Sequence, residues 1–236
     1  MSEFKRGLKD GLPIALGYVS VSFTFGLQAV SGGLGIWEAV LISLTNVTSA
    51  GQFAGLGIIL SGSGFWLEMA CTQFIINLRY ALMSLSLSQK VDKSLSGIHR
   101  WITGFAITDE IFVVAMGNEK PVNKKYMYSL ISLPLAGWVL GTFLGAAAGQ
   151  ILPEIVRNAM NIAIYGMFLA IIIPPAKKNS AILKVVILAA VLSCAFKWLP
   201  IINKVSSGFV IIICTIISAA AGAVLFPVET ESEGKE

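Results

Sequence analysis

Charged side chains are scarce in this sequence of 236 residues. Lys and Arg number 17 and Asp and Glu number 13, so charged residues make up 13% of the chain, against 56% hydrophobic residues. Soluble domains carry roughly a quarter charged residues, so the shortage excludes a soluble enzyme, and the high hydrophobicity excludes a disordered chain. The basic residues lie in short clusters between apolar stretches, which argues against nucleic acid as a partner. With a mean hydropathy of +0.79, the composition predicts an integral membrane protein.

Paired cysteines and catalytic motifs are also missing. Cys71, Cys194 and Cys214 lie inside apolar runs, and the chain has one histidine, so neither a disulfide framework nor a metal site is predicted. The sequence contains no P-loop, no HExxH and no GxSxG motif, which are the signatures of nucleotide, zinc and serine chemistry. We therefore expect no enzyme activity and no cofactor. If the chain is a transporter, the absence of a nucleotide-binding motif means that an ion gradient, a substrate gradient or a separate ATPase would have to drive it.

Long apolar runs, in contrast, are plentiful. A helix needs about 20 apolar residues to cross the hydrocarbon core, within a range of roughly 17–25. We predict an all-α membrane protein, residues 1–236 forming one transmembrane domain with an acidic tail at 228–236. The runs that fit full transmembrane helices are about six in number: Pro13–Val30, Trp66–Leu87, Tyr126–Gly149, Asn158–Ile173, Ala181–Trp198 and Val205–Phe226.

Two further apolar segments are irregular. Residues 36–60 are interrupted by a polar stretch from Thr45 to Gln52, and residues 102–117 are short and carry Thr108, Asp109 and Glu110 in their middle. Polar, broken backbone at membrane depth is tolerated only where it is buried in protein or lines a wet cavity. We therefore expect two broken or re-entrant helical segments besides the full spans.

Basic residues distinguish a re-entrant from a spanning topology. If both irregular segments cross the membrane once, Lys and Arg divide 8 to 6 between the two sides, and if both segments re-enter, the division is 11 to 3. The cytoplasmic side carries the excess of Lys and Arg. The count favours two re-entrant hairpins from opposite faces and cytoplasmic termini, with a single crossing by each segment as the alternative.

Three ionisable side chains lie deep in the predicted membrane: Arg79, Asp109 and Glu110. We expect Arg79 to bind a carboxylate, either of the substrate or of Asp109 or Glu110. The alternative is that Arg79 lies near a helix end and its side chain extends to the membrane surface. Adjacent helical residues point about 100° apart, so one acid can pair with Arg79 while the other carries a proton, because burial disfavours a charged carboxylate. A static ion pair is the alternative.

The break in residues 36–60 is the candidate substrate site. An anionic group at the N-terminus of the arm beginning near Ala50 would meet free N–H groups and the positive end of the helix dipole. Alternatively, the small residues there only let the turn pack closely. The predicted substrate-binding residues are Asn46, Thr48, Ser49, Gly51, Gln52, Asn77 and Arg79, and the predicted proton-coupling residues are Asp109 and Glu110.

Glycine recurs every fourth residue in one predicted span, at Gly137, Gly141, Gly145 and Gly149. Such a stripe lets a neighbouring helix approach closely. The neighbour belongs either to this chain or to a partner subunit.

Four segments, in order and spacing, resemble the AzlC or YgaZ type of branched-chain amino acid exporters: Asp10 to Gly17, Ala50 to Phe53, Asn77 to Tyr80 and Thr108 to Glu110. Members of that family commonly have histidine at the position of Tyr80, and often Pro-Phe-Gly where this chain has Tyr18 and its neighbours. The resemblance implies an exporter of leucine, isoleucine, valine or analogues that acts with a small membrane subunit of the AzlD or YgaH type, for which the glycine stripe is the candidate contact. A membrane channel or a non-transporting scaffold is the alternative function.

Overall fold

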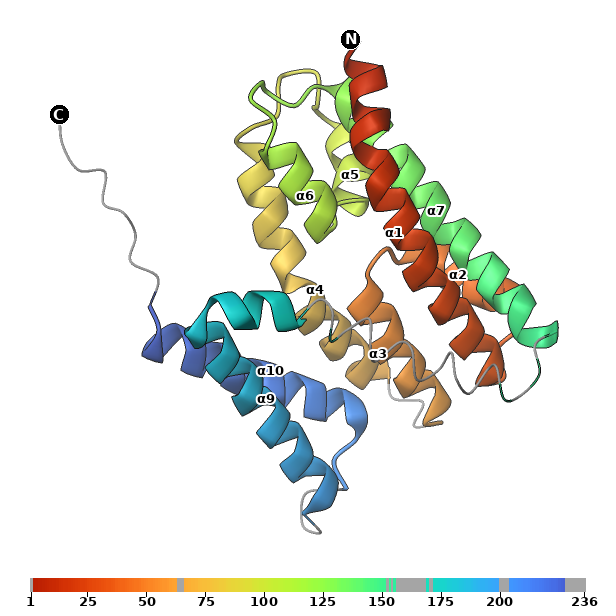
Figure 1. Cartoon of the computed structure of the whole chain (residues 1–236), viewed down its shortest axis with the longest axis vertical. Coiled ribbons are helices and arrows are strands. Elements are labelled where there is room, and N and C mark those ends of the chain that lie inside the picture. The colour runs from red at the N-terminus through yellow and green to blue at the C-terminus, as the bar shows by residue number, and fades with distance from the viewer. Residues whose placement is uncertain are drawn as a thin grey trace.

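The computed structural model describes residues 2–62, 66–151, 153, 155, 169, 172–199 and 204–227. Within these ranges the regular structure is helical, apart from one isolated β-bridge. The helices in chain order are α1 (Glu3–Ser31), α2 (Ile36–Thr45), α3 (Ser49–Leu60), α4 (Trp66–Ser88), α5 (Ile98–Phe105), α6 (Asp109–Met116), α7 (Lys124–Ile151), α9 (Ser180–Trp198) and α10 (Ser207–Leu225) (Figure 1). The predicted all-α membrane class is confirmed.

Four of the described helices, α1, α7, α9 and α10, are long and apolar enough to cross a membrane. They correspond to four of the six predicted spans. The fifth, Trp66–Leu87, forms α4, which has 23 residues, carries Glu68 and Arg79 within it, and is not among these four helices. The sixth, Asn158–Ile173, lies almost entirely outside the described residues, as does the acidic tail at 228–236.

Helices α1 and α7 run side by side along their lengths (Figure 1). Glycines on both helices make this possible, because a Cβ on Gly11 would lie 2.5 Å from the carbonyl oxygen of Leu130, and one on Gly141 would lie 2.6 Å from that of Val19. The glycine stripe of α7 thus packs against α1 of this chain. Its alternative role as the contact for a partner subunit is wrong, because the backbone of α1 occupies that face.

Helices α2 and α3 form a hairpin interrupted at residues 46–48. A Cβ on Gly32, just after α1, would lie 2.8 Å from a methyl group of Leu60 at the end of α3, so the hairpin begins and ends at the same end of the molecule. The segment is therefore re-entrant. The break covers Asn46 to Thr48 only, which is shorter than the predicted Thr45 to Gln52, because Ser49 to Gln52 already form the first turn of α3.

Helices α5 and α6 form the second hairpin. Val91, before α5, and Val122, after α6, pair in a parallel bridge, in which the N–H of Val122 donates to the carbonyl of Lys90 at 2.9 Å. The hairpin is thus also re-entrant, and the hydrogen bond from Asn123 Nδ2 to Glu3 Oε2, at 3.4 Å, places its base at the end that carries the N-terminus, the N-terminal end. The tips of the two hairpins meet in the middle of the molecule (Figure 1).

The position of the second hairpin bears on the charge count. Lys90 and Lys93, before α5, lie at the N-terminal end together with Lys120 and Lys124, after α6, since the bridge holds these two segments together. This placement agrees with the re-entrant alternative, in which basic residues gather on one side. The cytoplasmic location of that side stays a prediction.

Candidate functional site

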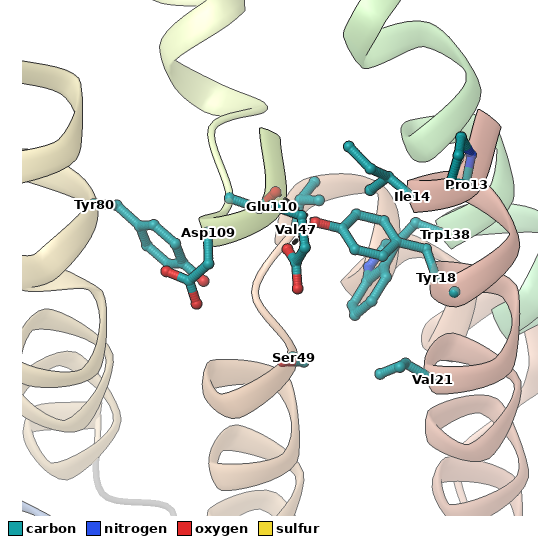
Figure 2. A pocket seen from close by; sticks show the side chains of 12 residues that line it. Pro13, Ile14, Tyr18, Val21, Val47, Ser49, Tyr80, Asp109, Glu110 and Trp138 are labelled. Atoms are coloured by element: carbon teal, nitrogen blue, oxygen red, sulfur yellow. Dashed lines mark hydrogen bonds between the residues drawn. The ribbon is translucent and has the colours of Figure 1, made fainter. Parts of the chain in front are cut away.

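The two hairpin tips line one cavity of about 490 Å³. Each tip ends in a threonine that caps a half-helix: Thr48 Oγ1 accepts from the N–H of Gly51, and Thr108 Oγ1 accepts from the N–H of Ile111, both at 3.4 Å. The N-termini of α3 and α6 therefore open on the same space (Figure 2). The cavity is lined by Pro13, Ile14, Gly17, Tyr18, Val21, Val47, Ser49, Tyr80, Thr108, Asp109, Glu110 and Trp138.

Asp109, which lines this cavity, forms an ion pair with Arg79. Arg79 Nη1 lies 2.7 Å from Asp109 Oδ2, and the two side chains are 45% and 42% exposed. The guanidinium also donates to the hydroxyl of Tyr80 at 3.1 Å and lies 4.9 Å from the centre of that ring. The structure thus realises one of the arrangements that the sequence left open, in which Arg79 binds a carboxylate of this chain.

The second acid has a different partner. The hydroxyl of Tyr18 donates to Glu110 Oε2 at 2.6 Å and also contacts the hydroxyl of Thr108. Tyr18 is buried, and its ring meets Trp138 edge-on at 5.2 Å between centroids. Tyr18 is a site residue that the sequence did not predict. The available signal was its phenol at a position where the resembling family often has Pro-Phe-Gly.

The two half-helix ends differ in charge. The first turn of α3 contains no acid, and the N–H groups of Ser49 and Ala50 have no acceptor within the helix. The first turn of α6 contains Asp109 and Glu110, which favour the positive end of their own helix dipole. Since Arg79 offsets Asp109, the cavity presents a positive helix end on one wall and the charge of Glu110 on the other.

Gln52, a predicted binding residue, stabilises the first hairpin and does not line the cavity. Gln52 is buried and donates from Nε2 to Ser43 Oγ at 2.7 Å, and Ser43 Oγ lies 2.6 Å from Thr142 Oγ1. This chain of polar contacts fastens α2 and α3 to α7. Because these side chains do not line the cavity, the geometry supports a structural role for Gln52.

Helix α4 holds the other side of the first hairpin. Gln73 Nε2 donates to the carbonyl of Gly51 at 2.8 Å, and Asn77 Nδ2 donates to Gln73 Oε1 at 3.1 Å. A Cβ on Gly51 would lie 2.7 Å from both Gln73 and Thr48, which agrees with the alternative that small residues let this turn pack closely. Asn46 follows the last turn of α2 and does not line the cavity.

Of the predicted substrate-binding residues, Ser49 lines the cavity and Thr48 borders it, accepting a hydrogen bond from Tyr80 at 3.4 Å. Both predicted proton-coupling residues, Asp109 and Glu110, line it as well. Within the described part of the chain, no three His, Cys, Asp or Glu side chains lie close enough together to hold a metal ion.

Membrane-spanning helices, two re-entrant hairpins and a largely apolar cavity with acidic side chains at their tips are the features of a multi-pass membrane protein related to transport. Comparison with known proteins gives the same class and defines it further. The chain belongs to the AzlC family: the family profile, described as AzlC protein, matches residues 13–152. The match runs from α1 to the end of α7 and so includes both hairpins and the cavity between them.

Individual relatives are also membrane proteins. The chain is 30% identical over 153 residues to the inner membrane protein YgaZ of Escherichia coli K12. The aligned region covers 63% of this chain and 62% of YgaZ. It is 34% identical over 176 residues to an uncharacterized membrane protein of Archaeoglobus fulgidus, covering 74% of this chain and 76% of the relative. No solved structure matches this chain.

Proposed function

We propose that this chain is the large subunit of a secondary transporter that exports branched-chain amino acids, namely leucine, isoleucine, valine or analogues. The observation that carries the proposal is the cavity at the hairpin tips, where an uncompensated helix N-terminus and an acidic helix start line one apolar space. Half-helix N-termini that point at an anionic substrate group are typical of transporters built from broken helices.

Each part of a branched-chain amino acid has a matching wall. The α-carboxylate accepts from the first-turn N–H groups at Ser49, and the ammonium group lies against Glu110. The branched side chain packs on the apolar lining that Val21, Val47 and Trp138 provide. A purely anionic or purely cationic ligand would leave one of the two polar walls unmatched, so the cavity favours a zwitterion.

Ion coupling is assigned to the acids at the start of α6. Asp109 has a fixed cationic partner, Arg79, whereas Glu110 is held by a neutral phenol. Glu110 can therefore gain or lose a proton without breaking an ion pair, and a gain weakens its attraction for the ammonium group of the substrate. We assign Glu110 as the proton-coupling residue and Asp109 as the group that orients Arg79.

The proposed assembly includes a small membrane subunit of the AzlD or YgaH type, lies in the cell membrane with both termini in the cytoplasm, and needs no cofactor. An alternative is a channel or a non-transporting scaffold. Ion channels select through rings of like charges or carbonyl groups around an open pore. The cavity instead contains one ion pair and one further acid, which supports a closed binding site for one molecule.

Exchange of labelled leucine across the membrane of proteoliposomes tests the proposal. The chain and its small subunit are purified together, and flux is measured with and without a proton gradient. Glu110→Gln should lower leucine exchange by at least about tenfold, because one charge-assisted hydrogen bond is worth roughly 1.5–3 kcal/mol. Glu38→Gln, at an exposed acid outside the cavity, is the matched control. Leucine flux that does not saturate would favour the channel, and no flux would favour the scaffold.

A further inference from the structure

A second pocket, of about 270 Å³, lies at the N-terminal end of the molecule. Its charged side chains are Arg6, Asp10, Glu119 and Lys120, two of each sign. Val114 and Gly117 of α6 form part of its wall. None of these residues lines the cavity at the hairpin tips, so the two pockets are separate spaces.

The same two helices nevertheless line both pockets. On α1, Arg6 and Asp10 line the outer pocket, and the cavity lining continues at Pro13, Ile14 and Gly17. Steps of three or four residues connect Arg6, Asp10, Pro13 and Gly17, and Ile14 lies four residues after Asp10, so all five positions share one face of the helix.

The opposing face belongs to α6. Glu110 lines the inner cavity, and Val114 and Gly117 line the outer pocket, again at intervals of four and three residues. At 1.5 Å per residue, Glu110 and Gly117 are about 10 Å apart along the helix. The two pockets therefore follow one another along a single seam between α1 and α6.

The seam between the pockets is apolar and shut. Ile14 is 9% exposed and belongs to the same hydrophobic cluster as Ile111, with Val114 packed against it. Beyond this barrier, the hydroxyl of Tyr126 donates to Asp10 at 2.9 Å, and the guanidinium of Arg6 lies 4.7 Å from the centre of the Tyr126 ring.

We propose that the outer pocket is a second binding site for the transported amino acid, and that the α1–α6 seam is its path between the inner cavity and the N-terminal end. Arg6 is already paired with Glu3 at 2.9 Å. The remaining charges suit a zwitterion, with Lys120 for the carboxylate and Asp10 or Glu119 for the ammonium group. The amide nitrogen of Asn118, which also lines this pocket, is a buried donor without an acceptor among the described residues. A substrate carboxylate would provide one. The proposal rests on the transport function proposed above.

Cysteine modification tests the path. In a chain whose three native cysteines are replaced by alanine, Gly117→Cys is placed in the wall of the outer pocket, where a Cβ would lie 3.3 Å from the carbonyl oxygen of Val113 and requires a shift of a few tenths of an ångström. Leucine exchange is measured before and after treatment with a bulky methanethiosulfonate reagent, so each variant is its own reference. We expect modification to remove most of the exchange. Lys93→Cys, exposed at the same end but outside the pocket, is the control and should be insensitive.

The outcomes separate the two proposals. If the native chain exchanges no leucine, the transport function is wrong, and only a cysteine-free chain that keeps the native exchange is used for the path. If the native chain does exchange leucine, and modified Gly117→Cys still exchanges leucine at the unmodified rate, the path is wrong. Val114→Cys gives the same test should Gly117→Cys fail to assemble.

Sidedness tests binding in the outer pocket. Lys120→Ala should raise the leucine concentration for half-maximal exchange when leucine is supplied from the N-terminal end, and leave it unchanged from the opposite side. An equal rise from both sides, or no rise from either, would overturn the second site.

Discussion

Replacing single glycines of α7 by alanine should destabilise the protein in an order set by the distance to α1. A Cβ on Gly145 would lie 2.6 Å from the carbonyl carbon of Phe23, with the carbonyl oxygen closer still, and one on Gly137 would lie 2.8 Å from the carbonyl oxygen of Ala15. A Cβ on Gly149 would meet a methyl group of Leu27 at 3.2 Å, which can rotate away. The expected order of damage is Gly145, then Gly137, then Gly149.

The size of the effect follows from two opposing terms. Alanine favours a helix interior over glycine by about 1 kcal/mol, whereas forcing extra atoms into a packed interface costs roughly 1–3 kcal/mol, with the upper end expected where the neighbour is backbone. Gly57 in α3 is the matched control, because a Cβ there has no atom within 4 Å. Gly57→Ala should be neutral or stabilising, and Gly145→Ala should be about 2–3 kcal/mol less stable than that control.

Thermal unfolding of purified protein in detergent measures the difference. For a chain of 150–250 residues, 1 kcal/mol corresponds to about 2–4 °C in Tm, so Gly145→Ala should melt several degrees below Gly57→Ala. Equal melting temperatures for these two variants would refute the close approach of α1 and α7. If Gly145→Ala instead has a normal Tm but loses the small subunit on purification, the glycine stripe contacts the partner subunit and not α1.

Substitutions at Asp109, Tyr18 and Thr142, with two matched comparisons, probe the cavity and its support. Asp109→Asn leaves Arg79 without its carboxylate and should lower leucine exchange strongly, while Asp109→Glu should recover part of it. Tyr18→Phe removes the donor to the second acid and should change the pH dependence of leucine exchange, whereas Tyr80→Phe, which removes a hydroxyl that contacts no acid, should leave that dependence unchanged. Thr142→Val deletes the contact that fastens the first hairpin to α7 and should cost about 1–3 kcal/mol in thermal unfolding, with an unaltered pH profile of any remaining exchange.

The membrane class and the two breaks could be predicted from the sequence because they depend on local composition. Apolar runs of sufficient length indicate spans, and ionisable residues such as Asp109 are costly in a lipid-facing helix. The re-entrant alternative was favoured by counting Lys and Arg, and the Val91 to Val122 bridge agrees with it. Four spans met the length and composition of membrane helices for the same local reason.

The roles of single polar residues could not be predicted in this way, because their partners are distant in sequence. Gln52 looked like a substrate ligand at a helix break, yet it bonds to Ser43, which contacts Thr142 across 99 residues. Tyr18 was missed because its acid partner, Glu110, is 92 residues away. A stripe of glycines likewise indicates close packing without naming the neighbour, and only the structure identifies α1.

The packing of α7 against α1 and the first hairpin also bears on how the chain is made. The second half of this helix pair is synthesised only after both hairpins, since α7 follows α6 in the chain. Until then, the Ser43 side chain of the first hairpin lacks its contact with Thr142. The first hairpin therefore gains its polar contact with α7 only after both of its own helices have been made.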